Sequence, residues 1–557
     1  MSTTRAGGPA ATKVPDTGLK RNIGFIGLMW ASAGSIIGSG WLYGADKGII
    51  QAGPAAIFSW IIGGAAILVL ALVHAELGGL YPIAGGTARF PHLAFGGVAG
   101  ASFGWFSWLQ AVTVSPIEVS AMIGYLSSYV PFAKGWLDDK TGVLTAPGLV
   151  AAVVIMIVFV AINFLSVKAL ANTNSAATWW KIGVPVFAIL VLALFSFHGS
   201  NFGGGDGFAP QGLKGVLAAM PNAGIIFALL GFEQADQLAG ESANPRRDIP
   251  RAVIGSVVIG LVIYLALQIV FIAAIPTSKM SGSWAHIGAQ FLTGPFALVA
   301  TAAGLAWLAA ILYIDAVISP GGTGLIYFTA TSRVSYGLSK NGYFPRIFEA
   351  VTNRGVPWFG LIAAWFIGCL CFLPFPSWQS LVGLITSASV LMYAGAPLAF
   401  GAFRKRLPDV ERPYKLPGGQ VLAPIAFIVA NLIIMWTGWT TDWQLGVAII
   451  LGYVVIVLNR VLRLNSTPIH LDWKAAQWLP VYLIGLGLIV LFSDWGPLKN
   501  PPITFGWDIL VVAVFSLGIY YWAINVAVSR EEIERITEET AVRMEEDELM
   551  SEPGPAH

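Results

Sequence analysis

Long apolar runs alternate with short charged loops along almost the whole chain. Each run is close to the ~20 residues that an α-helix needs to cross the hydrocarbon core of a bilayer. About fourteen spans are predicted in this way, at 23–46, 54–80, 95–129, 147–167, 172–197, 215–238, 251–275, 295–331, 356–374, 378–401, 421–441, 443–462, 477–494 and 508–528. Residues 355–403 include no charge, and Pro374 to Ser377 divide them into two spans joined by a tight turn. The pattern predicts an all-α polytopic membrane protein.

Composition agrees with this fold class. Hydrophobic residues make up 56% of the 557 residues, charged residues make up 11%, and mean hydropathy is +0.73. An average soluble domain carries roughly 25% charged residues, so this chain could not cover a soluble surface. The net charge of +2 gives no indication of nucleic-acid binding. The composition therefore indicates a lipid bilayer as the surroundings and leaves the oligomeric state open.

The placement of Lys and Arg predicts the orientation, because cytoplasmic loops carry an excess of these residues. With the N-terminus inside, 24 of the 31 Lys and Arg residues fall in inside segments, and Lys181 alone lies within a span. The lysines of the outside loops are Lys47, Lys134, Lys140, Lys214, Lys279 and Lys499. We therefore expect a multi-pass protein of the cell (inner) membrane with both termini cytoplasmic.

The first span contains a run that weakens a helix. Residues 34–41 read GSIIGSGW, and glycine in mid-helix carries a large backbone entropy cost. Unwound backbone at this depth survives only where it lines a cavity. Unwinding at Gly38 would expose the amides of Ser39, Gly40 and Trp41, which suit a carboxylate. Close helix packing through small residues is the alternative reading.

The sixth span contains a second candidate break. Residues 227–233 read FALLGFE, with one glycine before a carboxylate. Breaks in spans one and six indicate an inverted repeat of five helices with a substrate site between the breaks. An α-ammonium group is expected on the carbonyls of Ile36 or Ile37 and of Phe227, Ala228 or Leu230, with Phe232 as a mobile apolar lid. A zwitterionic amino acid fits this arrangement.

Ionisable residues inside spans are costly and are candidates for function. Lys181 could exchange a proton, or it could extend its amine to the inner boundary. Glu118 and Asp315 could each carry a proton, or each could be a satisfied structural carboxylate. Asp315 precedes Ser319 to Gly322 (SPGG), a run that we expect to interrupt the helix. For Glu76, near the inner end of span two, we favour a structural role.

The residues at these positions resemble those of the amino acid–polyamine–organocation (APC) permeases. Residues 34–41 resemble the first-helix signature, and residues 75–86 resemble the end of the second helix. The most specific match is GFE at 231–233 followed by NPRRDIPR at 244–251, and RPYKLPG at 412–418 resembles the loop after helix ten. Two departures are Trp41, where many members read GSGIF, and Arg89, where an aromatic residue is usual.

The resemblance implies a LeuT-type fold of two inverted five-helix repeats. With the span pattern it divides the chain into a cytoplasmic tail at 1–21, a ten-helix core at 22–401 and a cytoplasmic loop at 402–420. Four additional helices at 421–528 and an acidic cytoplasmic tail at 529–557 follow. We expect the last tail to form a short solvated helix rather than a partner site. Lys181 falls where proton-coupled members place a lysine whose amine stands in for a sodium ion.

The features look most like the bacterial aspartate–proton symporter branch, which implies proton-coupled uptake of an acidic amino acid. The alternatives are an amino acid exchanger and a proton symporter for neutral or cationic amino acids. A channel would show a continuous polar stripe, and a sensor would carry a soluble output module. An enzyme would need a cluster of catalytic residues. We therefore expect a transporter with no enzymatic activity, no cofactor and no metal.

Overall fold

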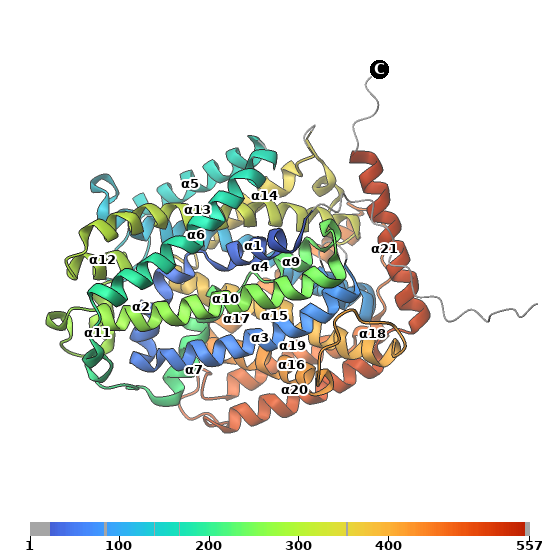
Figure 1. Ribbon diagram of the computed structural model, residues 1–557. Helices are drawn as coiled ribbons and strands as arrows, with labels where there is room; N and C mark the ends of the chain where they lie inside the picture. The colour runs from blue at the N-terminus through green and yellow to red at the C-terminus, as the bar shows by residue number, and fades with distance from the viewer. Residues whose placement is uncertain (1–22, 83–85, 139, 166, 353–354, 552–557) are drawn as a thin grey trace, which may run out of the picture.

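The protein is built from long helices that lie side by side, with connecting segments gathered at the two ends of the bundle (Figure 1). The computed structural model describes residues 23–82, 86–138, 140–165, 167–352 and 355–551. Within these ranges the regular structure is helical, and strand pairing is limited to isolated bridges. The predicted N-terminal tail at 1–21 lies outside the described residues.

The helices that precede residue 303 include both candidate breaks. They are α1 (Phe25–Ile36), α2 (Gly40–Ala52), α3 (Ala56–Leu80), α4 (Gly86–Tyr129), α5 (Ala146–Leu165), α6 (Val167–Phe195), α7 (Gly212–Asn222), α8 (Ile225–Ala228), α9 (Gln234–Gln237), α10 (Pro245–Ala274), α11 (Trp284–Ala289) and α12 (Pro295–Ala302).

The remaining helices complete the bundle and cross one of its ends. They are α13 (Ala306–Lys340), α14 (Trp358–Cys371), α15 (Trp378–Arg406), α16 (Gly419–Thr437), α17 (Trp439–Val461), α18 (Trp473–Ala476), α19 (Trp478–Phe492), α20 (Trp507–Val526) and α21 (Arg530–Ser551). α21 lies across the right-hand end of the bundle in Figure 1, and α11 and α12 lie at the opposite end. We refer to these as the α21 end and the α11 end.

Eleven helical segments in the described part of the chain are long and apolar enough to cross a membrane. They correspond to every predicted span except the first, the sixth and the ninth. The first and sixth spans are broken into shorter helices, and the ninth is the 14-residue α14. Apolar side chains such as Leu194 (77% exposed) and Ile484 (64% exposed) point outward, as a lipid-facing surface requires. The chain is a multi-pass membrane protein.

Three sequence-based expectations about the helices are wrong. The predicted span at 295–331 is two helices, because α12 ends at Ala302 and α13 begins at Ala306. α13 then continues through Pro320, because packing against α4, α5, α6 and α14 offsets the lost hydrogen bond and the ring clash of an interior proline. Lys47 lies inside α2 and not in a loop, since that helix runs to Ala52.

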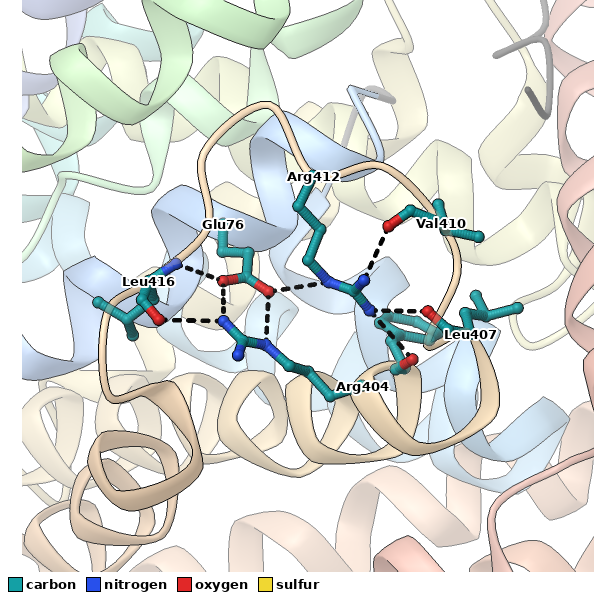
Figure 2. A network of polar contacts seen from close by, with 7 residues as sticks. Glu76, Arg404, Leu407, Val410, Arg412 and Leu416 are labelled. Atoms are coloured by element: carbon teal, nitrogen blue, oxygen red, sulfur yellow. Dashed lines mark hydrogen bonds and ion pairs between the residues drawn. The ribbon is translucent and has the colours of Figure 1, made fainter.

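A buried ion-pair network closes the α21 end of the core (Figure 2). The Glu76 carboxylate at the end of α3 accepts bonds from Arg404 Nη2 (2.6 Å) and Arg404 Nε (3.0 Å) of α15. Arg412 Nε lies 3.1 Å from it, and the Leu416 amide donates to it at 2.7 Å. Arg412 also donates to the Leu407 and Val410 carbonyls, so one carboxylate fixes the whole 407–416 loop. The geometry agrees with the structural role expected for Glu76.

The helix α21 packs against the bundle, which corrects the expectation of a solvated tail helix. Its apolar residues Ile533 and Ile536 are 1% and 5% exposed, and α21 contacts α4. α4 itself kinks at Gly96, where a φ of 76° favours glycine. Ile533 and Ile536 are three residues apart in the sequence, so both lie on one face of α21. This apolar face covers the kinked end of α4.

Candidate functional site

The two predicted helix breaks are present, and they lie against each other. α1 ends at Ile36 and α2 begins at Gly40, whereas α8 ends at Ala228 and α9 begins at Gln234. A Cβ on Gly40 would lie 2.6 Å from the Ala228 Cβ, so only glycine allows this approach. A Cβ on Gly231, whose φ is 116°, would lie 2.9 Å from the backbone of Ser35 and Ile36. The two interrupted chains therefore cross twice, once on each side of the break.

Side-chain hydroxyl groups form hydrogen bonds with backbone N–H and C=O groups that the helix breaks leave without helical partners. Ser32 Oγ accepts a bond from the Ala235 amide (3.0 Å) and donates to the Phe232 carbonyl (3.0 Å). Tyr264 of α10 donates its hydroxyl to the Ile36 carbonyl at 2.8 Å. Released N–H and C=O groups inside a membrane protein must find such partners. These bonds hold both breaks in fixed positions.

A small cavity lies between the breaks, with about 10 Å³ of room for the centres of water-sized spheres. Its walls come from the two breaks and from α4, α13 and α15: Ser35, Ile36, Gly38, Gly40, Gln110, Val114, Glu118, Phe227, Leu230, Thr323, Tyr327 and Ile385. The volume is about the room that one buried water needs, so a substrate enters only when the surrounding helices separate. Its mixture of aliphatic walls and a few polar groups suits a ligand that is itself both apolar and polar.

Glu118 occupies the amide end of the first break. Its Oε2 accepts a hydrogen bond from the Ser39 amide at 2.9 Å, and its side chain is fully buried. A Cβ on Gly38 would lie 2.6 Å from Glu118 Oε1, so Gly38 provides the space for this carboxylate. A negative charge at the start of a helix is favoured by the α2 dipole. The amide that was predicted to hold a ligand carboxylate therefore already holds a carboxylate of the protein.

Lys181 occupies the carbonyl end of the same break. Its Nζ donates to the Gly34 carbonyl (2.5 Å) in the last turn of α1 and to Thr323 Oγ1 (2.6 Å) of α13. A positive charge at the end of a helix is favoured by the α1 dipole. The amine is 1% exposed and lies beside the first-helix break, so its position does not match an amine extended to the membrane boundary.

The third predicted ionisable residue lies apart from the cavity. Asp315 is two turns of α13 from Thr323 and accepts a bond from Ser319 Oγ at 2.7 Å. The side chains of Trp41 and Trp180 lie close to it. Trp41 packs on Phe296 of α12 with ring centroids 5.4 Å apart, so its side chain points away from the cavity. Asp315 is therefore linked to the start of α2 but does not line the cavity.

The remaining predicted site residues divide between the cavity wall and the layer behind it. Ile36, Gly38, Gly40, Phe227 and Leu230 line the cavity, whereas Ile37, Ser39 and Ala228 do not. Phe232 lies on the side toward α9, where its ring packs on Tyr393 (4.7 Å between centroids) and His74 (5.2 Å).

Sequence reasoning did not find the polar network behind the second break. The buried Glu233 carboxylate accepts bonds from the Gly231 amide (2.9 Å) and Tyr393 (2.5 Å). Gln110 and Tyr327, each 3.3 Å from its other oxygen, also line the cavity. Glu233 follows the glycine of the second break, but its neutral partners come from α4, α13 and α15 and give no local sequence signal.

Known proteins resemble this chain along most of its length. A family model described as amino acid permease matches residues 23–458. The glutamate/serine transporter AimA of Bacillus subtilis is 36% identical over 512 residues, which cover 91% of this chain and 94% of that protein. The aspartate-proton symporter of Bacillus subtilis is 34% identical over 510 residues, with 90% and 96% covered. The match therefore runs through both helix breaks and the cavity between them.

Proposed function

Because this chain belongs to the amino acid permease family, we propose that it takes up an acidic amino acid, such as aspartate or glutamate, together with a proton. The observation that carries the proposal is the pair of apposed helix breaks around a small cavity with Lys181 and Glu118 at the two ends of one break. Two relatives support the substrate class. The name of one specifies glutamate and serine, and the name of the other specifies aspartate and a proton.

The substrate sits between the two breaks in this proposal. Its α-carboxylate accepts bonds from the amides of Ser39, Gly40 and Trp41 at the positive end of α2. Its α-ammonium lies near the carbonyls of Ile37 and of Ala228 or Leu230, because the Ile36 and Phe227 carbonyls already accept bonds from Tyr264 and the Leu230 amide. Glu118 must give up the Ser39 amide before the substrate carboxylate can take it.

The proton acts at the first break. A protonated Lys181 holds the Gly34 carbonyl and so fixes the end of α1. Loss of that proton removes the charge that favours this contact, which frees α1 to move and release substrate. We place the α21 end in the cytoplasm of the cell, so release occurs toward that end. The membrane potential assists whenever net charge moves inward, by about 2.3 kcal/mol per charge per 100 mV.

Uptake of radiolabelled aspartate by proteoliposomes, competed by acidic, neutral and basic amino acids, tests the proposal. An imposed pH gradient, acidic outside and without sodium, should drive accumulation, and only acidic compounds should compete strongly. Competition by neutral or basic compounds alone would reject the acidic substrate. Uptake that occurs only into vesicles preloaded with amino acid would identify an exchanger in place of a symporter.

A further inference from the structure

A second cavity lies on the α11 side of the central one. It has about 50 Å³ of room for the centres of water-sized spheres, and its walls come from α2, α4, the described residues of the loop between α4 and α5, Leu292 and the start of α15. Tyr43 and Trp378 form its floor, with stacked rings 5.0 Å apart. Phe227, which lines the central cavity, packs edge-on against Trp378. We call this second cavity the vestibule, since one aromatic layer separates it from the substrate site.

Lys47 is the charged residue of the vestibule wall, and its side chain is only 9% exposed. Its Nζ lies 3.7 Å from Asp46 Oδ2, which is too long for a hydrogen bond. The Lys47 ammonium group therefore has an ion-pair partner in Asp46, but this contact is too long to use any of its three N–H donors in a hydrogen bond. A buried charge with unused donors is costly unless a ligand or solvent completes its shell.

The neighbouring groups favour an anion in the vestibule. Ser120 Oγ lines the same wall, is buried, and has no hydrogen-bond partner among the described residues. Asp46 is fully buried beside Lys47, and a Cβ on Gly288 of α11 would lie 3.1 Å from its Oδ1. The carboxylate of Asp46 therefore faces α11, and the ammonium of Lys47 faces the space that a ligand could enter.

The vestibule is also connected to the substrate site by a hydrogen bond. Trp378 donates its indole N–H to Ser39 Oγ at 2.9 Å, and the Ser39 amide holds Glu118. An occupant that displaces the Trp378 ring would therefore act directly on the residue that receives the substrate carboxylate. Lys47 lies in α2 and Ser39 is the residue just before this helix, so their eight-residue separation is about 12 Å along the helix axis.

We propose that Lys47 and Ser120 form a capture site in the vestibule for the side-chain carboxylate of an acidic amino acid. The inference rests on the proposed transport function. It assigns to Lys47 the selection of acidic over neutral substrates before the Tyr43–Trp378 layer opens. Lys47 donates charge-assisted hydrogen bonds to the carboxylate, and Ser120 adds a hydroxyl donor. Because the Asp46 carboxylate competes for the same ammonium group, it opposes capture.

Substitutions of the Asp46–Lys47 pair test the proposal through the KM of uptake for aspartate and for serine. The double variant D46N/K47Q avoids leaving one buried charge unpaired, which would by itself destabilise the fold. It should raise the KM for aspartate about tenfold or more, and it should change the KM for serine less than about twofold. The single variant D46N leaves the Lys47 charge without its ion-pair partner, so its folded fraction is first measured by gel filtration. In the folded D46N protein the KM for aspartate should fall, and K47R should keep it near the wild-type value. K279Q, which removes an exposed lysine at the same end, is the matched control.

Opposite effects of D46N and D46N/K47Q distinguish capture from a purely structural ion pair, which would make both variants worse. An aspartate KM within about twofold of wild type in D46N/K47Q would overturn the capture site while the transport proposal stands. An equal rise for serine and aspartate would also overturn it, because Lys47 would then bind the α-carboxylate that all amino acids share. Failure of the wild-type protein to transport any amino acid would instead refute the proposed function.

Discussion

At the scale of single residues, two opposite charges bracket the break in the first predicted span. Lys181 holds the Gly34 carbonyl at the end of α1, and Glu118 holds the Ser39 amide at the start of α2. Each charge matches the dipole of the helix end that it touches, so each contact is stronger while its residue is ionised. A proton gained by Glu118 or lost by Lys181 would weaken one side of the break.

The variant E118Q tests the anionic half of this arrangement. A glutamine carbonyl can still accept the Ser39 amide, but it stays neutral at every pH, so it no longer responds to a proton. We expect accumulation driven by a pH gradient to fall at least about tenfold, while exchange between labelled and preloaded substrate continues. Both are measured by radiolabelled uptake in the same proteoliposomes. Gradient-driven accumulation at the wild-type level would remove Glu118 from the coupling mechanism.

At the scale of elements, the site depends on how closely the two broken helices approach each other. Gly40 begins α2 directly against Ala228 of α8, and Gly231 lies against the end of α1. These contacts are between backbones, so neither partner can move aside as a flexible side chain would. The apposition makes the released amides of one break and the carbonyls of the other available to a single small ligand.

The variant G40A should therefore impair transport even though alanine favours helix. Its Cβ would lie 2.6 Å from the Ala228 Cβ and 2.8 Å from the Ala228 Cα, which forces the breaks apart. We expect uptake to fall at least about tenfold, since misplacement of binding groups by about 1 Å costs this much or more. G183A in α6 is the matched control, because nothing lies within 4 Å of its Cβ position. Normal uptake in G40A would show that this apposition is not required.

At the scale of the whole molecule, the described structure is closed on both sides of the central cavity. The Tyr43–Trp378 layer lies toward the α11 end, and Phe232 packs with Tyr393 and His74 on the other side. Beyond that layer, Glu76 fixes the 407–416 loop at the α21 end (Figure 2). Transport in either direction requires one of these layers to separate while the other stays packed.

Much of this arrangement could be predicted from local sequence. A glycine-rich run located the first break, a single glycine before a carboxylate located the second, and the scarcity of charge drew attention to Lys181 and Glu118. Lys47 was misplaced because a count of lysines treats a charge at the end of an apolar run as a loop residue. The partners of Glu233 come from three other helices, so they emerge only from the packing.

Proton movement into the vesicle interior tests the central claim most directly. Proteoliposomes that contain a pH-sensitive dye and have no preset gradient are exposed to external aspartate, and internal pH is followed as labelled aspartate enters. The account predicts that the interior of wild-type vesicles acidifies in step with uptake, and that the K181A variant shows no such acidification. Uptake by the wild-type protein without acidification, or full acidification in K181A, would contradict the account.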